Sequence, residues 1–256
     1  MRIDIATTAT LRPELLVKTF RSFWRNLFGY SRHSFYLYIN VDPVGFTEDK
    51  IDTEYRFLDI EDICRNYFGD RYTMFTPQEA HFPSAVRRCW TMPTGFARFV
   101  FNLEEDWELQ YPLDFDTMVE VMGHNPDVAH LRLSIFKSTQ ESCKNWSKFF
   151  IWNGEFFECP IAERGGIGWC GHPSLNRVEL IQDAVKNIDF TKNPEKQMKA
   201  HYNWFKKWST NYRFGSFQPQ NSPASIKDIG REWMIKNKWK KKEKNKEWFT
   251  TWKRSE

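Results

Sequence analysis

Apolar residues near the start of the chain follow two spacings, which separate strands from a helix. In residues 2–6 and 35–42 they occupy every second position, and in residues 11–28 they recur three or four positions apart. Pro13 fits the first turn of that helix, and Thr10 fits the N-cap position before it. The order predicts a strand, a threonine-rich loop, a helix and a second strand, as in the first part of a βαβ unit.

Further along, the same two spacings continue to alternate. They predict strands at residues 71–77, 98–103 and 127–136, helices at 84–92 and 112–122, a hairpin within 137–160 around Asn153 and Gly154, a glycine-rich loop running into a helix at 165–185, and a helix then a loop at 190–225. This alternation predicts an α/β fold with a mostly parallel sheet flanked by helices and a small antiparallel hairpin. In such a sheet, ligands bind beyond the carboxyl ends of the strands.

The positive charge of the chain is concentrated near its end. The 256 residues are enough for one main domain, and the formal net charge is +4. Residues 231–254 hold ten Lys or Arg and three Glu, so the rest of the chain carries 27 basic and 30 acidic residues. We therefore predict a near-neutral domain over residues 1–225 and a basic, tryptophan-rich, helical extension over residues 226–256 that faces a partner.

The cysteines and the apolar runs bear on the compartment. The five cysteines are odd in number and form no CxxC pair, so neither a disulfide framework nor a zinc ribbon is indicated. No signal-peptide pattern follows Met1, and no apolar run approaches the roughly 20 residues that span a bilayer. These features predict a cytoplasmic protein without a membrane segment.

Three consecutive carboxylates, Glu104, Glu105 and Asp106, follow the predicted strand at residues 98–103. Carboxylates this close repel one another and are costly to desolvate unless a cation or hydrogen-bond donors offset their charge. Such oxygens can hold a divalent metal, which offsets the charge of a diphosphate leaving group. The alternative is a solvated acidic turn. The apolar character of the strand before them favours the functional interpretation.

The sequence lacks the motifs of two other kinds of active site. The sequence has no G-x-S-x-G elbow, as in serine hydrolases, and no G-x-x-x-x-G-K-[ST] loop, as in P-loop enzymes. None of the six histidines pairs at a metal-binding spacing such as HxxxH. The acidic cluster is therefore the main candidate for chemistry.

A strand that ends in Glu-Glu-Asp, with a Thr/Arg loop after the first strand and an Asp after the second, resembles the GT-A nucleotide-sugar glycosyltransferases. The stretch LEEDW is similar to the LEDDW form of their metal motif in family-2-like and phage-encoded members. The resemblance extends from Arg2 to about Trp239, although only NLEEDWEL is specific. It implies a metal-dependent transferase, inverting by preference, with a UDP-type donor and Mn²⁺ or Mg²⁺.

The resemblance also implies roles for individual residues on the donor side. Glu104 and Asp106 would reach the metal and the ribose, with Glu105 in the same nucleotide-sugar site but pointing differently. Asp228 in KDIGREW stands where the family commonly has a histidine ligand, so it is expected to be the third metal ligand unless it only caps a helix. The base, ribose and diphosphate would contact residues whose groups suit a polar anion, namely Thr7, Thr8, Arg12, Asp42, Arg87 and Arg88.

An inverting transfer also needs a general base beside the acceptor hydroxyl. Glu195, directly after a proline at a predicted helix start, is similar in position to the acidic base of this family. The helix dipole explains a glutamate there equally well. Asp183 is the second candidate for the base. The acceptor pocket is expected to be lined by Gly171, His172, Pro173 and Ser174.

The extension interleaves lysines, among them Lys240, Lys241 and Lys242, with tryptophans. Lysines neutralise phosphates and tryptophans stack on bases, although a solvated helix with packed tryptophans is the alternative. Some phage-encoded members of this class glycosylate hydroxymethylated pyrimidines, so we expect 5-hydroxymethylcytosine-type bases in DNA as the acceptor. Two rival hypotheses stay open: a transferase acting on a surface glycan or small acceptor, and a non-catalytic nucleic-acid-binding protein. The oligomeric state is not predicted.

Overall fold

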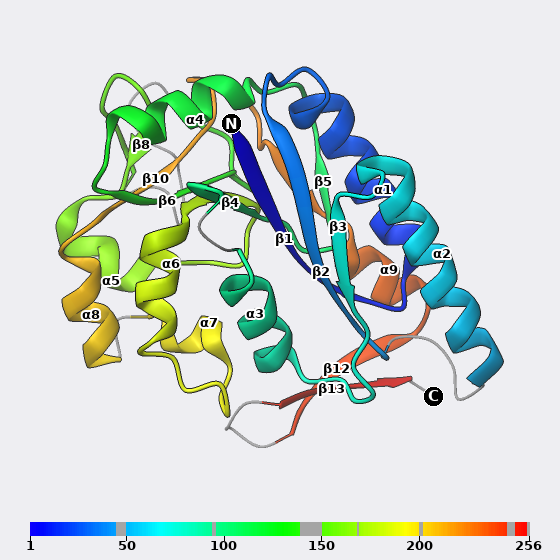
Figure 1. The fold of residues 1–256 in the computed structure, drawn as a ribbon. Coiled ribbons are helices and arrows are strands. Elements are labelled where there is room, and N and C mark those ends of the chain that lie inside the picture. Colours follow the sequence, from blue (N-terminus) through cyan, green and yellow to red (C-terminus); the bar gives the residue numbers. More distant parts are fainter. Residues whose placement is uncertain are drawn as a thin grey trace.

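The computed structural model describes residues 1–44, 50–93, 96–138, 150–167, 169–199, 202–244 and 249–254, with side chains up to Trp239 except at residues 50, 51 and 167. Its centre is a nine-stranded sheet in the order β3-β2-β1-β4-β9-β6-β10-β8-β7 (Figure 1). These strands are β1 (Arg2–Thr10), β2 (Ser34–Asp42), β3 (Tyr72–Phe75), β4 (Phe99–Asn102), β6 (Val128–Arg132), β7 (Ile151–Trp152), β8 (Phe157–Glu158), β9 (Ser174–Arg177) and β10 (Arg213–Ser216). All run in one direction except β8 and β9.

Helices cover both faces of the sheet. They are α1 (Pro13–Phe23) with a π-helical turn (Trp24–Phe28), α2 (Lys50–Phe68), α3 (Phe82–Thr91), α4 (Phe115–His124), a 3₁₀ turn (Ile161–Glu163), α5 (Arg164–Ile167), α6 (Val178–Val185), α7 (Pro194–Gln197), α8 (Asn203–Ser209) and α9 (Gly230–Lys236). Alternation along β1 explains the layers, because Ile3 and Ile5 join the core under α1, α2 and α4, while Ala6 joins the core under α3, α6 and α8. Figure 1 shows α1 and α2 on one side of the sheet and α3 and α6 on the other.

Two small antiparallel sheets complete the fold. The first pairs β5 (Trp107–Leu109) with β11 (Ile226–Asp228) and so places the start of the predicted extension beside the acidic cluster. The second pairs β12 (Trp239–Lys244) with β13 (Phe249–Arg254). The expectation of a helical extension is therefore right for α9 only, and the segment after it forms strands.

The α/β class, the flanking helices and the strand positions predicted from the sequence are confirmed. The hairpin around Asn153 and Gly154 is present, with Gly154 at a φ of 107°, but residues 153–156 form a four-residue loop instead of a two-residue turn. The prediction of a threonine-rich loop after the first strand was wrong, because β1 continues through Thr10. Thr10 does not cap α1 either: the N-cap position is Arg12, without a side-chain cap.

Strand β9 was not predicted. It inserts between β4 and β6 and runs antiparallel to both, in a stretch interpreted as a loop leading into a helix. Its four residues are all buried although two of them are Asn176 and Arg177. Polar residues obscured the apolar pattern on which strand prediction depends.

Candidate functional site

The middle carboxylate of the acidic cluster, Glu105, is buried and bound to the segment that leads into α1. It is 2% exposed. It accepts hydrogen bonds from the backbone N–H and the hydroxyl of Thr10, each at 2.7 Å, and from Arg12 Nε at 2.9 Å, and it forms an ion pair with Arg12 Nη2. Burial raises the pKa of Glu105, and the charge of Arg12 opposes that rise. Arg12 and Glu105, both predicted to bind the nucleotide sugar, join the end of β1 to the end of β4.

The first carboxylate, Glu104, faces a pocket of about 450 Å³ at the carboxyl end of β4. Its Oε2 accepts a hydrogen bond from Trp107 Nε1 at 3.3 Å, and Trp107 is in turn edge-on to the ring of His172 at 5.0 Å between centroids. Glu104 is half-buried, unlike Glu105. Two neighbouring residues therefore differ in role: Glu105 is a structural carboxylate, and Glu104 is one that a ligand in the pocket could reach.

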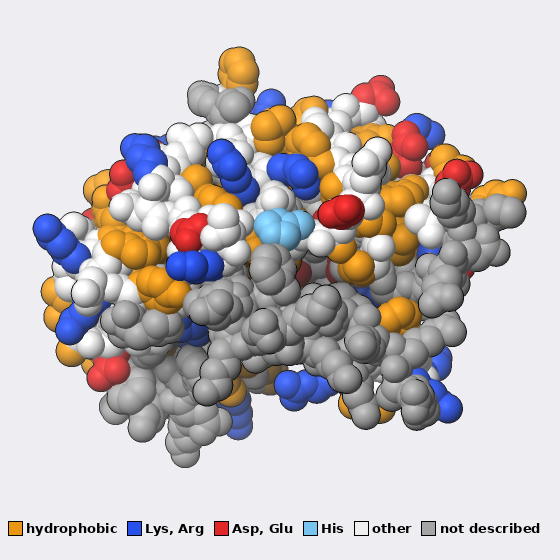
Figure 2. Space-filling view, turned by 90° about the horizontal axis from the view of Figure 1, so that it is seen from below, with side chains coloured by type: hydrophobic (Ala, Val, Ile, Leu, Met, Phe, Trp, Pro, Cys, Tyr) orange, Lys and Arg blue, Asp and Glu red, His pale blue; other side chains and the backbone are white. Residues whose placement is uncertain are grey.

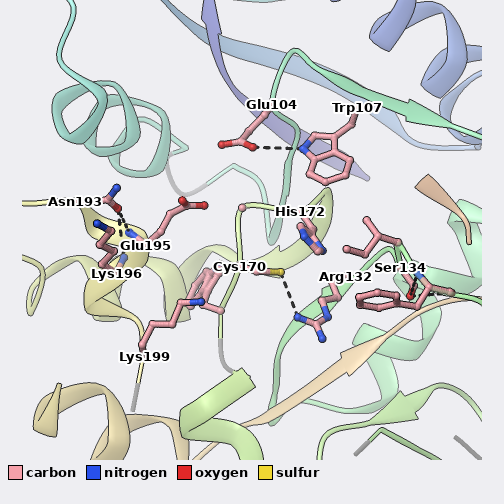
Figure 3. Close-up of a pocket in the computed structure, with 14 residues that line it drawn as sticks. Glu104, Trp107, Arg132, Ser134, Cys170, His172, Asn193, Glu195, Lys196 and Lys199 are labelled. Atoms are coloured by element: carbon pink, nitrogen blue, oxygen red, sulfur yellow. Dashed lines mark hydrogen bonds between the residues drawn. The ribbon is translucent and has the colours of Figure 1, made fainter. Parts of the chain in front are cut away.

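Glu195 reaches the same pocket from α7. Asn193 caps this short helix, its Oδ1 accepting from the N–H groups of Glu195 at 2.9 Å and Lys196 at 3.3 Å. A Cβ placed on Gly171 would lie 2.2 Å from Glu195 Oε1 and 3.3 Å from Glu104 Oε1, so both carboxylates rest against this glycine. Figure 3 shows the two side chains directed toward one another across the pocket. The predicted base and the predicted donor-side carboxylate thus meet at a predicted acceptor residue.

The third carboxylate, Asp106, lies against the C-terminal segment. It accepts from Arg12 Nη2 at 3.3 Å, and its backbone oxygen accepts from Ile229 N–H at 2.9 Å. The side chain packs on Gly230, where an added Cβ would meet Asp106 Oδ2 at 2.2 Å. Asp228 pairs with Trp107 in the small sheet, which brings it near the cluster as expected.

Asp228 nevertheless uses its carboxylate as a cap. Its Oδ1 accepts from the N–H groups of Gly230 at 2.9 Å and Arg231 at 3.1 Å, at the start of α9. Asp228 thus satisfies helix N–H groups as in the alternative to metal binding, although the N-cap position itself is Ile229. In the part of the chain with described side chains, no group of three or more His, Cys, Asp or Glu residues is placed to hold a metal ion. We therefore leave Asp228 out of the candidate metal site.

Asp106 and Glu104 still suit a metal of one kind. Mg²⁺ in nucleotide enzymes is commonly held by one or two carboxylates together with substrate phosphates, without an all-protein cage. Both are half-buried at the end of β4, where β1 and β4 adjoin and the strand order reverses. The carboxylate oxygens of the two residues are of the kind that Mg²⁺ prefers, and a metal held by them would be completed by a diphosphate.

A second polar group lies at the end of β2. Asp42 is 7% exposed and accepts from Asn40 Nδ2 at 2.7 Å and from the backbone N–H of His81 at 3.1 Å. Arg88 Nη1 donates to Asn40 Oδ1 at 2.8 Å. Burial raises the pKa of Asp42, against the effect of these donors. Two of the residues predicted to bind the nucleotide sugar, Asp42 and Arg88, are therefore brought together through Asn40.

The other predicted residues lie elsewhere. Thr7 is fully buried in β1, and the carbonyl of Thr8 accepts from Glu105 N–H at 3.3 Å. Arg87 is exposed and stacks over the Phe190 ring. Asp183 accepts from Trp208 Nε1 at 2.9 Å and does not line the pocket; nor do Pro173 and Ser174, which are buried beside the pocket residues Gly171 and His172. The side chains of Lys240, Lys241 and Lys242 lie outside the described residues.

Several pocket residues were missed. Arg132, Cys170, Lys196 and Lys199 line it together with Trp169. Arg132 ends β6, so the rule that ligands bind at the carboxyl ends of strands applied to it as it did to Glu104. Cys170 directly precedes the predicted acceptor residue Gly171. This adjacency was the feature of the sequence that could have indicated Cys170 as a pocket residue. Lys196 in the short helix α7 and Lys199 just beyond it carry no such signal.

This end of the sheet has mixed charge. Figure 2, seen from the side where β1 and β2 end, shows Lys and Arg side chains close to Asp and Glu around a histidine. The described residues of this face therefore carry no uniform charge of one sign.

Comparisons with known proteins identify the fold. No protein-family model matches the chain, and no curated protein is similar to it in sequence. Among solved structures, Staphylococcus aureus TarS 1–349 in complex with UDP aligns with a TM-score of 0.53 at 11% identity, over 86% of this chain and 61% of that one. The mannosyltransferase PcManGT from Pyrobaculum calidifontis, in complex with GDP-Man and Mn²⁺, aligns with a TM-score of 0.52 at 10% identity, over 86% of this chain and 55% of that one.

The chain therefore has the GT-A-like fold of nucleotide-sugar glycosyltransferases. It spans less than two thirds of either of these proteins. Among the helices that the structure describes, none combines the length and the apolar character needed to cross a membrane.

Proposed function

We propose that this protein is a metal-dependent glycosyltransferase that moves a sugar from a nucleotide sugar, preferably a UDP-sugar, to an acceptor hydroxyl. The observation that carries this proposal is the meeting of Glu104 and Glu195 at Gly171, in a pocket at the carboxyl end of β4. A transferase needs polar groups that bind the sugar donor and a base that takes the proton of the acceptor. Glu104 is proposed for the donor side and Glu195 for the base, and the two come from distant parts of the chain. The GT-A-like fold supports a nucleotide-sugar donor.

Glu195 is the proposed general base. The acceptor oxygen attacks the anomeric carbon, the bond from that carbon to the diphosphate breaks with its electron pair, and Glu195 takes the proton of the acceptor hydroxyl. A single displacement of this kind inverts the configuration of the sugar. Half-burial of Glu195 beside Trp169 and Trp107 in the same pocket excludes part of the water that would compete as acceptor.

Asp106 and Glu104 would hold Mn²⁺ or Mg²⁺ together with the donor phosphates. When bound, the metal offsets the negative charge that develops on the leaving diphosphate. Arg12 keeps the main chain of this acidic turn in place through Glu105, so that its neighbours project from a fixed backbone. Asp42 and Arg88 are the proposed contacts of the nucleoside.

Donor turnover tests this proposal. The purified protein is incubated with a panel of nucleotide sugars, with Mn²⁺ or with a chelator, and release of nucleoside diphosphate is measured. We expect Asp106→Asn to abolish the metal-dependent release while the circular dichroism spectrum stays that of the wild type, because an amide cannot supply the anionic ligand. Glu108→Gln, two residues further on β5, is the matched control and should retain activity. Full turnover in Asp106→Asn would remove the metal assignment.

For the acceptor we propose hydroxymethylated bases in DNA, on the strength of the basic, tryptophan-rich sequence of residues 231–254. A base inside a duplex would have to be flipped into the pocket, at a cost of a few kcal/mol. Sugar transfer to hydroxymethylated but not to unmodified DNA would support this acceptor. Transfer to small hydroxyl acceptors alone would favour the rival transferase, and an absence of donor turnover with retained DNA binding would favour the non-catalytic alternative.

A further inference from the structure

The floor of the pocket holds a sulfur atom among basic side chains. Cys170 Sγ lies 3.4 Å from Arg132 Nη1 and 3.8 Å from His130 Nε2. Figure 3 shows the Arg132 contact and His172 beside it. Cys170 itself is partly exposed to the pocket. The other charged groups that line the same space are Glu104, Glu195, Lys196 and Lys199.

Arg132 gives the first reason to regard this sulfur as an anion. The residue is 6% exposed, and among the described residues no carboxylate forms an ion pair with it. Its guanidinium packs on the Phe150 ring at 4.6 Å and donates to Cys170 Sγ. A buried charge is costly unless an opposite charge is close, and a thiolate at this position supplies one.

His130 gives the second reason. It is fully buried, with Nδ1 2.7 Å from Asn176 Oδ1. The Asn176 amide nitrogen donates to the carbonyl of Ser174 at 3.0 Å, which directs its oxygen to the imidazole as an acceptor. Nδ1 therefore carries the proton, and Nε2 presents its lone pair toward Cys170 Sγ. A nucleophile beside a base that is oriented by a third group is the arrangement that activates cysteines.

We propose that Cys170 is a nucleophilic thiolate and that this cluster is a covalent modification site for hydroperoxides, which oxidise Cys170 to the sulfenic acid. The thiolate forms when the thiol proton passes to His130 Nε2, and in the reaction this sulfur attacks one oxygen of the peroxide. An S–O bond forms and the O–O bond breaks. The sulfur loses two electrons, the peroxide gains them, and its second oxygen leaves as hydroxide or alkoxide, which takes up the proton.

The other described cysteines lack this environment. Burial raises the pKa of Cys64, Cys89 and Cys159 to about 12 in each case. Burial also acts to raise the pKa of Cys170, but the electrostatic effects of His172 and Arg132 and the hydrogen bond with His130 outweigh it, so that this pKa lies well below the usual range. The same protein therefore contains three internal references for an unreactive thiol.

Oxidation would place an additional oxygen next to Gly171, between the carboxylates and Arg132. This consequence rests on the proposed function, because it predicts that sugar transfer stops while the donor still binds through the proposed nucleoside contacts Asp42 and Arg88. The reactivity of the thiol does not rest on it. The two are tested by separate measurements.

The reactivity is measured by alkylation of the folded full chain with iodoacetamide, followed by peptide mass mapping, in a Cys143→Ser background. At about pH 6 we expect Cys170 to react roughly tenfold faster than a free cysteine peptide, since its larger thiolate fraction outweighs its lower intrinsic nucleophilicity. Cys64, Cys89 and Cys159 should stay unmodified. A rate for Cys170 at or below that of the peptide would overturn the proposal, whatever the enzymatic activity.

Two variants and a peroxide experiment complete the test. Arg132→Met should raise the pH at which alkylation is half-maximal, and Arg132→Lys should largely restore the wild-type value. Equal pH profiles for the wild type and both variants would overturn the role of Arg132.

Hydrogen peroxide followed by dimedone should label Cys170 in the wild type, a measurement that needs no variant to fold. Labelling at the other cysteines instead would contradict the site. Nucleotide-sugar binding to the oxidised protein, compared with sugar transfer, then tests the proposed block separately.

Discussion

Glu104 and Glu105 are neighbours in the sequence but differ in almost every physical respect. Glu105 is buried, is held by Thr10 and Arg12, and belongs to the framework. Glu104 opens into the pocket, where it meets Glu195 across a glycine. The difference teaches that an acidic cluster at a strand end can divide its roles: one carboxylate fixes the turn, and those on either side are positioned by it.

The sharpest test of the pocket side is Glu195→Gln. The variant keeps the size of the side chain and removes its ability to take the acceptor proton, so we expect the transfer rate to fall by about 10²- to 10⁴-fold with donor affinity little changed. Steady-state transfer and donor titration measure the two effects. Asp183→Asn is the matched control, because Asp183 bonds to Trp208 outside the pocket. Loss of transfer in the control with retention in Glu195→Gln would exchange the two assignments.

The framework side is tested by Glu105→Gln. The substitution leaves Arg12, 3% exposed, without its buried counter-charge, and breaking a buried ion pair from one side typically costs about 3–5 kcal/mol. Urea unfolding should show this loss, whereas Glu104→Gln should change the free energy of unfolding by less than about 1 kcal/mol. Replacing both partners, as in Arg12→Met with Glu105→Leu, should recover part of the loss. Equal effects of Glu104→Gln and Glu105→Gln would remove the distinction between the two carboxylates.

The sequence predicted where these carboxylates would lie but could not tell them apart. Strand and helix periodicity placed the cluster at the carboxyl end of a core strand, and the resemblance placed Gly171, His172 and Glu195 around one pocket; the structure brings these together. Which carboxylate is buried depends on Arg12, which is distant in sequence and had itself been assigned to the nucleotide. An ion pair between residues so far apart in the sequence depends on how the chain packs, and it leaves no local pattern in the sequence.

The same limit explains the other differences. The cap role of Asp228 depends on where α9 begins, and helix ends are set by capping geometry. Strand β9 is polar at Asn176 and Arg177 because those side chains bond His130 and the carbonyl of Val128 inside the protein. Hydrophobic periodicity reports burial of apolar side chains only, so a buried polar strand is invisible to it.

Two glycines offer a smaller and more selective comparison. Gly230→Ala would place a Cβ 2.8 Å from Asp106 Cβ, a fixed atom, so α9 must shift and we expect a loss of about 1–3 kcal/mol in unfolding experiments. Gly171→Ala would mainly meet Glu195 Oε1, the end of a flexible side chain. It should lower transfer more than stability. The opposite outcome, a stable Gly230→Ala with a destabilised Gly171→Ala, would mean that the pocket is the rigid region.

The smallest structural effect is expected in the basic extension, where the acceptor is decided. If Lys240, Lys241, Lys242, Lys244 and Lys246 contact phosphates, each contact releases a condensed counterion, and DNA affinity falls as salt rises with a slope of about 0.9 per contact on logarithmic axes. Changing all five to Gln should flatten that slope and raise the apparent KM for DNA, with the free energy of unfolding and donor hydrolysis unchanged, since neither depends on the phosphate contacts. DNA binding measured across a salt series for both proteins decides the matter. Gln at Lys18, Lys186, Lys192, Lys206 and Lys207, all outside the extension, gives a matched control of equal charge change. If the extension and control variants flatten the slope equally, the extension acts only through net charge, and the mixed-charge pocket alone must select the acceptor.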